Sequence, residues 1–300
     1  MPKMYRADIA SIAAFAALMI SSASITACAA GFTAKQLAEE ESKFAVYSVQ
    51  HGMRAAFLEF FAEQSWLLRP EPVDAKPWLR ARPDPAIILD WKSQRTVMSA
   101  SGDLGFSTGP WLLKSKADPK APAAHGQFFS VWQKQKDGQW KVFIDHGISH
   151  GVTATPEALP TASLIAVDLA ARKPGGADVD AERDFIDRTR VRGTVPAYRE
   201  SVTVRTVLLR DGQFPIEGRD AAVAYVNAQQ GEWTWTPTIQ GVSAAKDVMY
   251  AVGSYVWKPA TGDARKGQYV RVWVRDASGD APDRWTLEGE VMTPMSAPKT

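Results

Sequence analysis

Three hundred residues allow one large domain or two domains of ordinary size. The chain is 45% hydrophobic and 23% charged, which is normal for a globular protein that buries a core. Its net charge of +2 gives no broad electrostatic field, which argues against nucleic acid or an anionic membrane surface as a partner.

The segment 1–29 has the features of a secretory signal peptide. Lys3 and Arg6 provide a basic start, and the apolar run Ile9–Ile20 is too short to span a bilayer comfortably. The sequence therefore predicts an exported, periplasmic protein without a transmembrane span.

The only cysteine, Cys28, closes this segment. With Ile25 at the leading position, the four residues that end at Cys28 resemble a bacterial lipobox. Two outcomes are open: a lipidated Cys28 would tether the protein to a membrane surface, whereas cleavage after Ala29 or Ala30 would discard it. Either way, no cysteine pair is available for a disulfide or a zinc site.

Two helices are predicted next. Thr33 and Gln36 have the spacing of a capping box, and Gly52 is a typical helix stop. Between them, apolar residues recur at helical spacing, while Glu39–Glu41 fall largely on the opposite, polar face. A second helix is expected over Met53–Glu63.

Strand patterns dominate the rest of the first half. A Pro-rich stretch reaches Pro85, with one helical turn around Trp78. Leu164–Ala171 is compatible with a strand or a helical turn, and Lys173–Gly176 is a breaker. The expected strands are Ser65–Arg69, Arg95–Ala100, Leu104–Lys114, Gly126–Lys134 and Gln139–Asp145, with a short element at Ile87–Trp91.

The hairpin Gly126–Asp145 shows the clearest alternation, around a turn at Asp137-Gly138. Successive side chains of a strand point to opposite faces. We therefore expect Phe128, Ser130 and Trp132 opposite Gln127, Phe129 and Val131 in the first strand, and Trp140, Val142 and Ile144 opposite Lys141, Phe143 and Asp145 in the second.

The same hairpin returns as Gly267–Glu290, and other residues recur in the same order 141 or 144 positions later. Matched pairs include Phe44/Phe185, Gly52/Gly193, Phe57/Tyr198, Trp91/Trp235, Ser99/Ser243, Ser130/Arg271 and Trp132/Trp273. The chain is thus expected to hold one domain twice, over 33–150 and 178–294, with a linker at 151–177 and a tail at 295–300.

Each copy resembles the nuclear transport factor 2 superfamily, which includes ketosteroid isomerase and SnoaL-like domains, and the first copy is similar to secreted bacterial SnoaL-like domains of unknown function. The residues that carry the resemblance are Ala55–Leu58, Trp66–Pro72, Ser99–Gly105, Thr108–Trp111, Val131-Trp132 and Trp140–Asp145. The resemblance implies an α+β fold: two tandem cone-shaped domains, each a curved antiparallel sheet packed on N-terminal helices. It does not imply one function, because this fold carries enzymes, binding modules and association domains.

The resemblance also implies a cone-shaped pocket, in which active members use an Asp or Glu as a proton-transfer base. Asp145 is the candidate base, with His150 beyond the expected strand end as its candidate partner. The alternative is a structural carboxylate that binds a backbone donor or an arginine. The candidate ligand-pocket residues are Trp66, Arg69, Trp78 and Trp111 in the first copy, and Arg210 and Glu290 in the second.

No nucleotide-binding, zinc-protease or serine-hydrolase motif is present, and the four histidines lack metal-ligand spacing, so neither a cofactor nor a metal is predicted. One hypothesis is an exported module that binds a small apolar or amphipathic molecule, or that pairs its two domains or forms a homodimer through the sheets. The other is a lyase or isomerase with Asp145 as base. An Asp145 that points into a cavity beside Arg69 or His150 favours the enzyme, and one that points to solvent or to an outer arginine favours the module.

Overall fold

The computed structural model describes residues 31–152, 156–170, 180–275 and 284–295. The predicted signal peptide, including Cys28, lies outside the described residues. Helix α1 (Ala34–His51) starts at the predicted capping box, where Thr33 Oγ1 accepts from the Gln36 amide at 3.2 Å and the Gln36 side chain accepts from the Thr33 amide at 2.9 Å. It ends at Gly52, whose φ of 93° suits glycine, and α2 (Met53–Phe60) follows.

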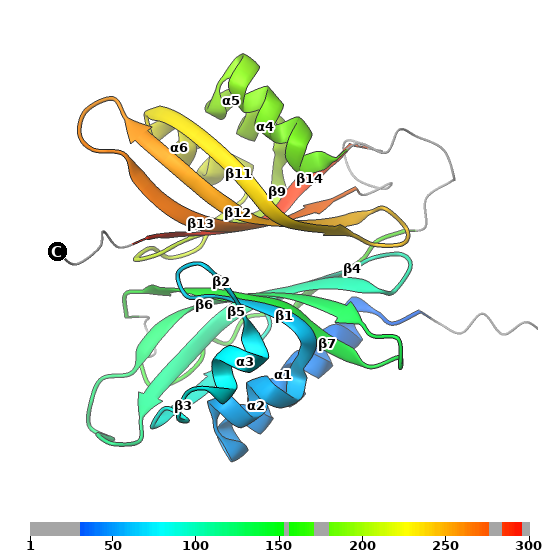
Figure 1. The fold of residues 1–300 in the computed structure, drawn as a ribbon, viewed down its shortest axis with the longest axis vertical. Coiled ribbons are helices and arrows are strands. Elements are labelled where there is room, and N and C mark those ends of the chain that lie inside the picture. The colour runs from blue at the N-terminus through cyan, green and yellow to red at the C-terminus, as the bar shows by residue number, and fades with distance from the viewer. Residues whose placement is uncertain (1–30, 153–155, 171–179, 276–283, 296–300) are drawn as a thin grey trace, which may run out of the picture. The chain divides into compact units, whose positions relative to one another are not determined.

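The first half forms an eight-stranded sheet in the order β2-β1-β7-β6-β5-β4-β8, with β3 beside β5. Helices α1, α2 and α3 (Ala75–Arg80) cover one face of it (Figure 1). The strands are β1 (Phe61–Leu68), β2 (Pro72–Asp74), β3 (Ile87–Trp91), β4 (Arg95–Met98), β5 (Leu104–Ser115), β6 (Ala124–Lys134), β7 (Trp140–His150) and β8 (Ile165–Asp168).

The second half repeats this plan in a six-stranded sheet, β10-β9-β14-β13-β12-β11. Helix α5 (Thr194–Ser201) corresponds residue by residue to α2, and the single strand β11 (Gly231–Val242) takes the place of β3 and β4. The other elements are α4 (Ala181–Arg192), β9 (Val202–Arg210), β10 (Ile216–Glu217), α6 (Arg219–Ala228), β12 (Val248–Pro259), β13 (Arg265–Val274) and β14 (Thr286–Pro294).

The predicted α+β class with two cone-like units is confirmed, but the sheets are mixed rather than antiparallel. β1 runs parallel to β7, β9 runs parallel to β14, and β4 runs parallel to β8. Strand β8 lies inside the segment expected to be a linker, so Ile165–Asp168 is a strand rather than a helical turn and extends the first sheet.

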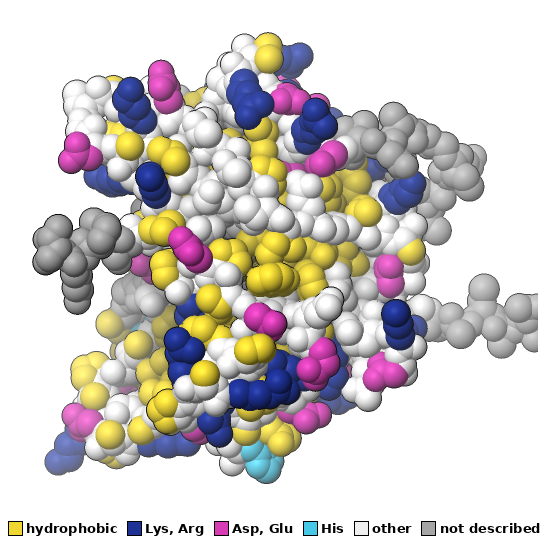
Figure 2. Space-filling model, in the orientation of Figure 1, with side chains coloured by type: hydrophobic (Ala, Val, Ile, Leu, Met, Phe, Trp, Pro, Cys, Tyr) yellow, Lys and Arg dark blue, Asp and Glu magenta, His cyan; other side chains and the backbone are white. Residues whose placement is uncertain are grey.

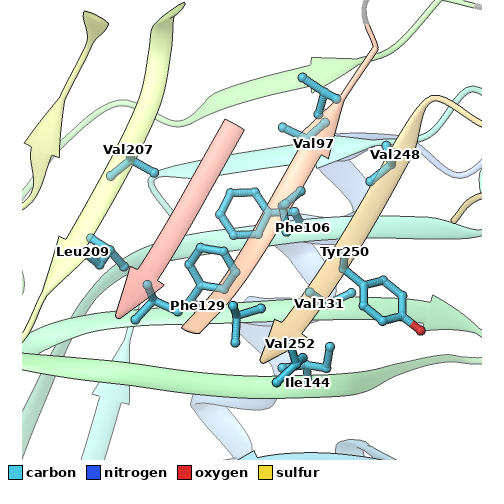
Figure 3. Close-up of a cluster of buried hydrophobic side chains, with 14 of the residues drawn as sticks. Val97, Phe106, Phe129, Val131, Ile144, Val207, Leu209, Val248, Tyr250 and Val252 are labelled. Atoms are coloured by element: carbon cyan, nitrogen blue, oxygen red, sulfur yellow. The ribbon is translucent and has the colours of Figure 1, made fainter. Parts of the chain in front are cut away.

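The two sheets contact each other through their helix-free faces. Phe106, Phe129 and Ile144 of the first sheet share one buried apolar cluster with Val252 and Val272 of the second (Figure 3). Two hydrogen bonds cross this contact reciprocally: the Ala100 amide donates to Asp247 at 2.8 Å, and the Ala244 amide donates to Asp103 at 2.9 Å. Ala100 and Ala244 are equivalent residues of the two halves, and so are Asp103 and Asp247. The contact therefore has the self-complementary pattern of a two-fold dimer interface.

A β-bulge in β7 decides where Asp145 points. Val131 pairs with Ile144, but Trp132 pairs with Val142, so one residue of β7 has no partner in β6. The expected alternation is therefore wrong from Ile144 onwards: Ile144 joins the cluster between the sheets, and Asp145 lies on the helix-covered face with Val142. β14 has a bulge at the equivalent place.

The distribution of charged side chains on the surface agrees with the small net charge of the chain. Basic and acidic side chains are interspersed on the face drawn in Figure 2, rather than gathered by sign. None of the helices that the structure describes is long and apolar enough to cross a membrane.

Candidate functional site

The first half contains a cavity of about 230 Å³ on the helix-covered side of its sheet. Its walls are mainly apolar, and the charged side chains among them are Arg69 and Asp145. The lining residues are Met53, Phe57, Arg69, Leu89, Trp91, Trp111, Leu113, Phe128 and Asp145–Ser149. Apolar walls with a few polar groups are typical of small-molecule sites.

A glycine makes room for the ring of Trp111, one of the two tryptophans in the cavity wall. A Cβ on Gly126 would lie 2.3 Å from the indole of Trp111, so only glycine lets β6 pass beneath this ring. The second half uses the same device, since a Cβ on Gly267 would lie 2.4 Å from the ring of Tyr255. Both halves thus pack an aromatic ring closely against a strand glycine.

Asp145 is the acidic group at the cavity. Its Oδ2 accepts a hydrogen bond of 2.9 Å from Ser130 Oγ, which stands opposite it on β6. Burial raises the pKa of Asp145 to about 6, although the positive charge of Arg69 and the bond from Ser130 lower it in part. At neutral pH this carboxylate is ionised yet more basic than an ordinary aspartate.

A second carboxylate, Glu41, lies beneath the cavity wall and is fully buried. Its oxygens accept from the indole nitrogens of Trp91 at 2.8 Å and Trp132 at 2.7 Å. Burial raises the pKa of Glu41 to about 7; the two indoles oppose this shift, and the charge of Asp145 adds to it.

Sequence reasoning missed Glu41, because it placed the glutamates of α1 on the polar face. The signal was available: Glu41 falls in helical register with the buried Leu37, Phe44 and Ser48. Glu182 recurs 141 positions later, as the buried core residues do.

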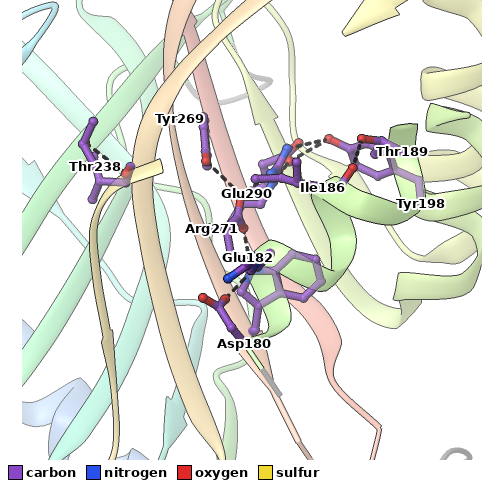
Figure 4. Close-up of polar contacts among 12 residues, drawn as sticks. Asp180, Glu182, Ile186, Thr189, Tyr198, Thr238, Tyr269, Arg271 and Glu290 are labelled. Carbon is purple, nitrogen blue, oxygen red and sulfur yellow. Dashed lines mark hydrogen bonds and ion pairs between the residues drawn. The ribbon is translucent and has the colours of Figure 1, made fainter. Parts of the chain in front are cut away.

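In the second half, an arginine lies between the two carboxylates that are equivalent to Glu41 and Asp145. Arg271, at the position of Ser130, donates to Glu182 at 2.6 Å and to Glu290 at 2.5 Å (Figure 4). Glu290 also binds Arg210 and accepts from Tyr198 at 2.7 Å. Burial would raise the pKa of Glu290, but the two arginines bring it below its ordinary value.

The two sites therefore differ in charge. The second half joins the carboxylates Glu182 and Glu290 to two arginines, Arg210 and Arg271. The first half has two carboxylates in the equivalent places, Glu41 and Asp145, but the equivalent of Arg271 is a serine, so Arg69 is the one arginine of the matching set.

The structure does not bring His150 to Asp145. β7 continues to His150, and strand alternation turns this residue to the other face. Its ring lies 4.6 Å from that of Phe214, and its Nε2 is 3.3 Å from the Gln127 amide nitrogen. His146 likewise faces the other sheet, where it bonds Thr293 at 2.9 Å, and burial lowers its pKa to about 3.

The remaining candidates are divided between the cavity and other places. Trp111 and Arg69 line the cavity, with Arg69 exposed to solvent. Trp66 packs against the cluster between the sheets. Trp78 lies 5.7 Å from the Arg69 guanidinium and 4.0 Å from that of Arg82. Among the described residues, no group of three or more His, Cys, Asp or Glu could hold a metal ion.

No family model matches the chain, and no curated protein matches it either. Solved structures do resemble it. An NTF2-like protein of unknown function from Shewanella oneidensis is 17% identical over 39% of this chain and 96% of its own, with a TM-score of 0.32. A ketosteroid isomerase-like protein from Erwinia carotovora is 16% identical over 40% of this chain and 100% of its own, with a TM-score of 0.31.

A third similar structure is an NTF2-like protein with a cystatin-like fold from Novosphingobium aromaticivorans. It is 17% identical over 41% of this chain and 84% of its own, with a TM-score of 0.33. These are proteins of the kind to which the sequence resemblance pointed.

Proposed function

We propose that the first half binds a small, mainly apolar molecule in its cavity, with a polar group of the ligand directed at Asp145 and Arg69. The main support for this proposal is that these two charged residues line a cavity of about 230 Å³ whose walls are otherwise mainly apolar. Buried apolar contact supplies affinity in such a site, and the few polar groups fix the orientation of the ligand.

In this proposal the second half is a structural partner. Its carboxylates are already bound by Arg210 and Arg271, and its sheet covers apolar residues of the first sheet, such as Phe129. A duplicated chain would thereby carry its own dimer contact. We further propose that the protein acts after export, as the N-terminal segment suggests.

Proton transfer by Asp145 is the second candidate function. Asp145 lines the cavity beside Arg69, which is the position that favours an enzyme over a binding module. Its pKa of about 6 suits a general base near neutral pH. The side chain of His146, the next residue, bonds Thr293 of the other half rather than Asp145.

A thermal-shift screen of the purified protein against a metabolite library tests the binding proposal. A ligand at 100 times its Kd should stabilise the folded state by about 2.7 kcal/mol. Asp145→Asn should weaken that shift, whereas Asp118→Asn, at an exposed turn, should leave it unchanged. If every ligand found binds both variants like the wild type, the site lies elsewhere.

Turnover of each ligand found then separates the two candidates. A proton-transfer enzyme should lose about 10²–10⁴-fold in kcat with Asp145→Asn. A binding module should leave every ligand chemically unchanged.

A further inference from the structure

We propose that the polar group held in the first-half cavity is a small organic cation, a guanidinium, amidinium or amine, which pairs with Asp145 as the Arg271 side chain pairs with Glu290 in the second half. This inference rests on the proposed function and names the class of its ligand. Its basis is the equivalent site of the second half, where two carboxylates bind the guanidinium of Arg271.

Two carboxylates bind the guanidinium of Arg271, and aromatic rings pack against it. It donates to Glu182 and Glu290, and its Cζ lies 3.9 Å from the ring centre of Trp235 and 4.5 Å from that of Phe185. This is a complete cation site, with charge-assisted hydrogen bonds and cation–π contacts. The cation in it belongs to the protein itself.

The first half keeps the parts of this site and lacks the cation. Its equivalents of the two carboxylates are Glu41 and Asp145, and its equivalents of Trp235 and Phe185 are also Trp and Phe, namely Trp91 and Phe44. Ser130 replaces Arg271 and bonds Asp145 as Arg271 bonds Glu290. Asp145, which Ser130 bonds, lines the cavity.

A cation next to Arg69 has a precedent in the same chain. Arg210, the equivalent of Arg69, binds Glu290 together with Arg271, so one carboxylate in this place accepts two positive groups. With Glu41 and Asp145 both ionised, the first half would carry one uncompensated negative charge beside Arg69. One monovalent cation would restore the balance that the second half shows.

The contacts of such a ligand follow from the burial of the two carboxylates. Asp145 lines the cavity and can bind the cation directly, while Glu41 is covered and acts through its charge. Trp91, Trp111 and Phe57 supply aromatic walls for the apolar part of the ligand. Burial raises the pKa of Asp145 to about 6 and that of Glu41 to about 7, and a cation bound at Asp145 would lower both values.

Two probes of nearly the same shape test the inference by calorimetry on the whole protein. Benzamidine carries a planar cation on an aromatic ring, and benzamide is its neutral counterpart. At pH 7.5 we expect benzamidine to bind at least about 10-fold more tightly than benzamide, the ratio that one charge-assisted hydrogen bond provides. Asp145→Asn should remove this preference, so that the two probes bind the variant with affinities within about 3-fold of each other.

A second variant checks the comparison between the halves directly. Ser130→Arg supplies a guanidinium from within the chain, as Arg271 does, and should abolish benzamidine binding. Equal affinity for the two probes, a preference that survives Asp145→Asn, or no binding of benzamidine would each overturn the inference. If neutral library ligands still bind this cavity in that case, the proposed function stands alone; if nothing binds, both fail.

Discussion

Arg271→Met should lower the free energy of unfolding by about 3–5 kcal/mol, the loss typical of breaking one side of a buried ion pair. Methionine keeps most of the volume but leaves Glu182 without its cation and Glu290 with Arg210 alone. All four charged side chains of this network are buried, so water cannot replace the lost contacts. Urea unfolding followed by tryptophan fluorescence measures the change.

The equivalent position in the first half gives the control. Ser130→Ala removes a single hydrogen bond to Asp145, and its cost should be about 1 kcal/mol.

The loss of stability in Arg271→Met should also be smaller at pH 5 than at pH 8, because Glu182 and Glu290 can take up protons once Arg271 is gone. A loss below about 1 kcal/mol at pH 8 would mean that the network contributes little to stability.

Glu41 should take about 3 kcal/mol from the stability of the folded protein as pH rises from about 4.5 to 8. His146, whose pKa burial lowers to about 3, acts in the opposite direction up to about pH 6.5, so the contribution of Glu41 is measured against a variant. The pKa of Glu41 is raised from 4.5 to about 7, so between these values the folded state binds more protons than the unfolded state. The contribution of Glu41 to stability therefore falls with rising pH until Glu41 is ionised in both states. Asp145 contributes in the same direction up to about pH 6.

Glu41→Gln isolates this contribution. The difference in unfolding free energy between the variant and the wild type should change with pH over this window and be constant above about pH 8. Glu39→Gln, at an exposed site on the same helix, should keep the wild-type profile. A wild-type minus Glu41→Gln difference that does not vary with pH would show that Glu41 is not titrating in the folded protein as described.

The parts of the fold that depend on local pattern could be predicted from the sequence. Thr33, Gln36 and Gly52 define α1 through contacts within a few residues of each other, and the structure has these caps. The alternation in β6 correctly placed Phe128, Ser130 and Trp132 on one face, which the structure shows to be the helix-covered one. The duplication was visible because matched residues keep their order and spacing along the whole chain.

The features that shape the site depend on distant contacts. A bulge adds one residue without changing the composition of a strand, so nothing in β7 itself shows that Asp145 shares a face with Val142. Glu41 is buried because indoles 50 and 91 positions away donate to it. His150 was expected beyond the strand end, but pairing with His125 carries β7 through it and turns its ring away.

The contrast between Ser130 and Arg271 is also readable only in three dimensions. The two residues could be matched by register, yet a serine opposite an arginine in a sequence comparison looks like ordinary divergence. The structure shows that Arg271 brings a positive charge to Glu290, whereas Ser130 gives Asp145 a single hydrogen bond and Asp145 lines a cavity. At this position the second half therefore holds an arginine bound by two carboxylates, and the first half has a carboxylate that lines a cavity.

A crystal structure of the protein with the tightest ligand from the screen tests this division most directly. We predict that the ligand lies in the first-half cavity with its polar group within hydrogen-bond distance of Asp145, and that Arg271 keeps its bonds to Glu182 and Glu290. A ligand bound in the second half, or one bound elsewhere while the first-half cavity is empty, would contradict it.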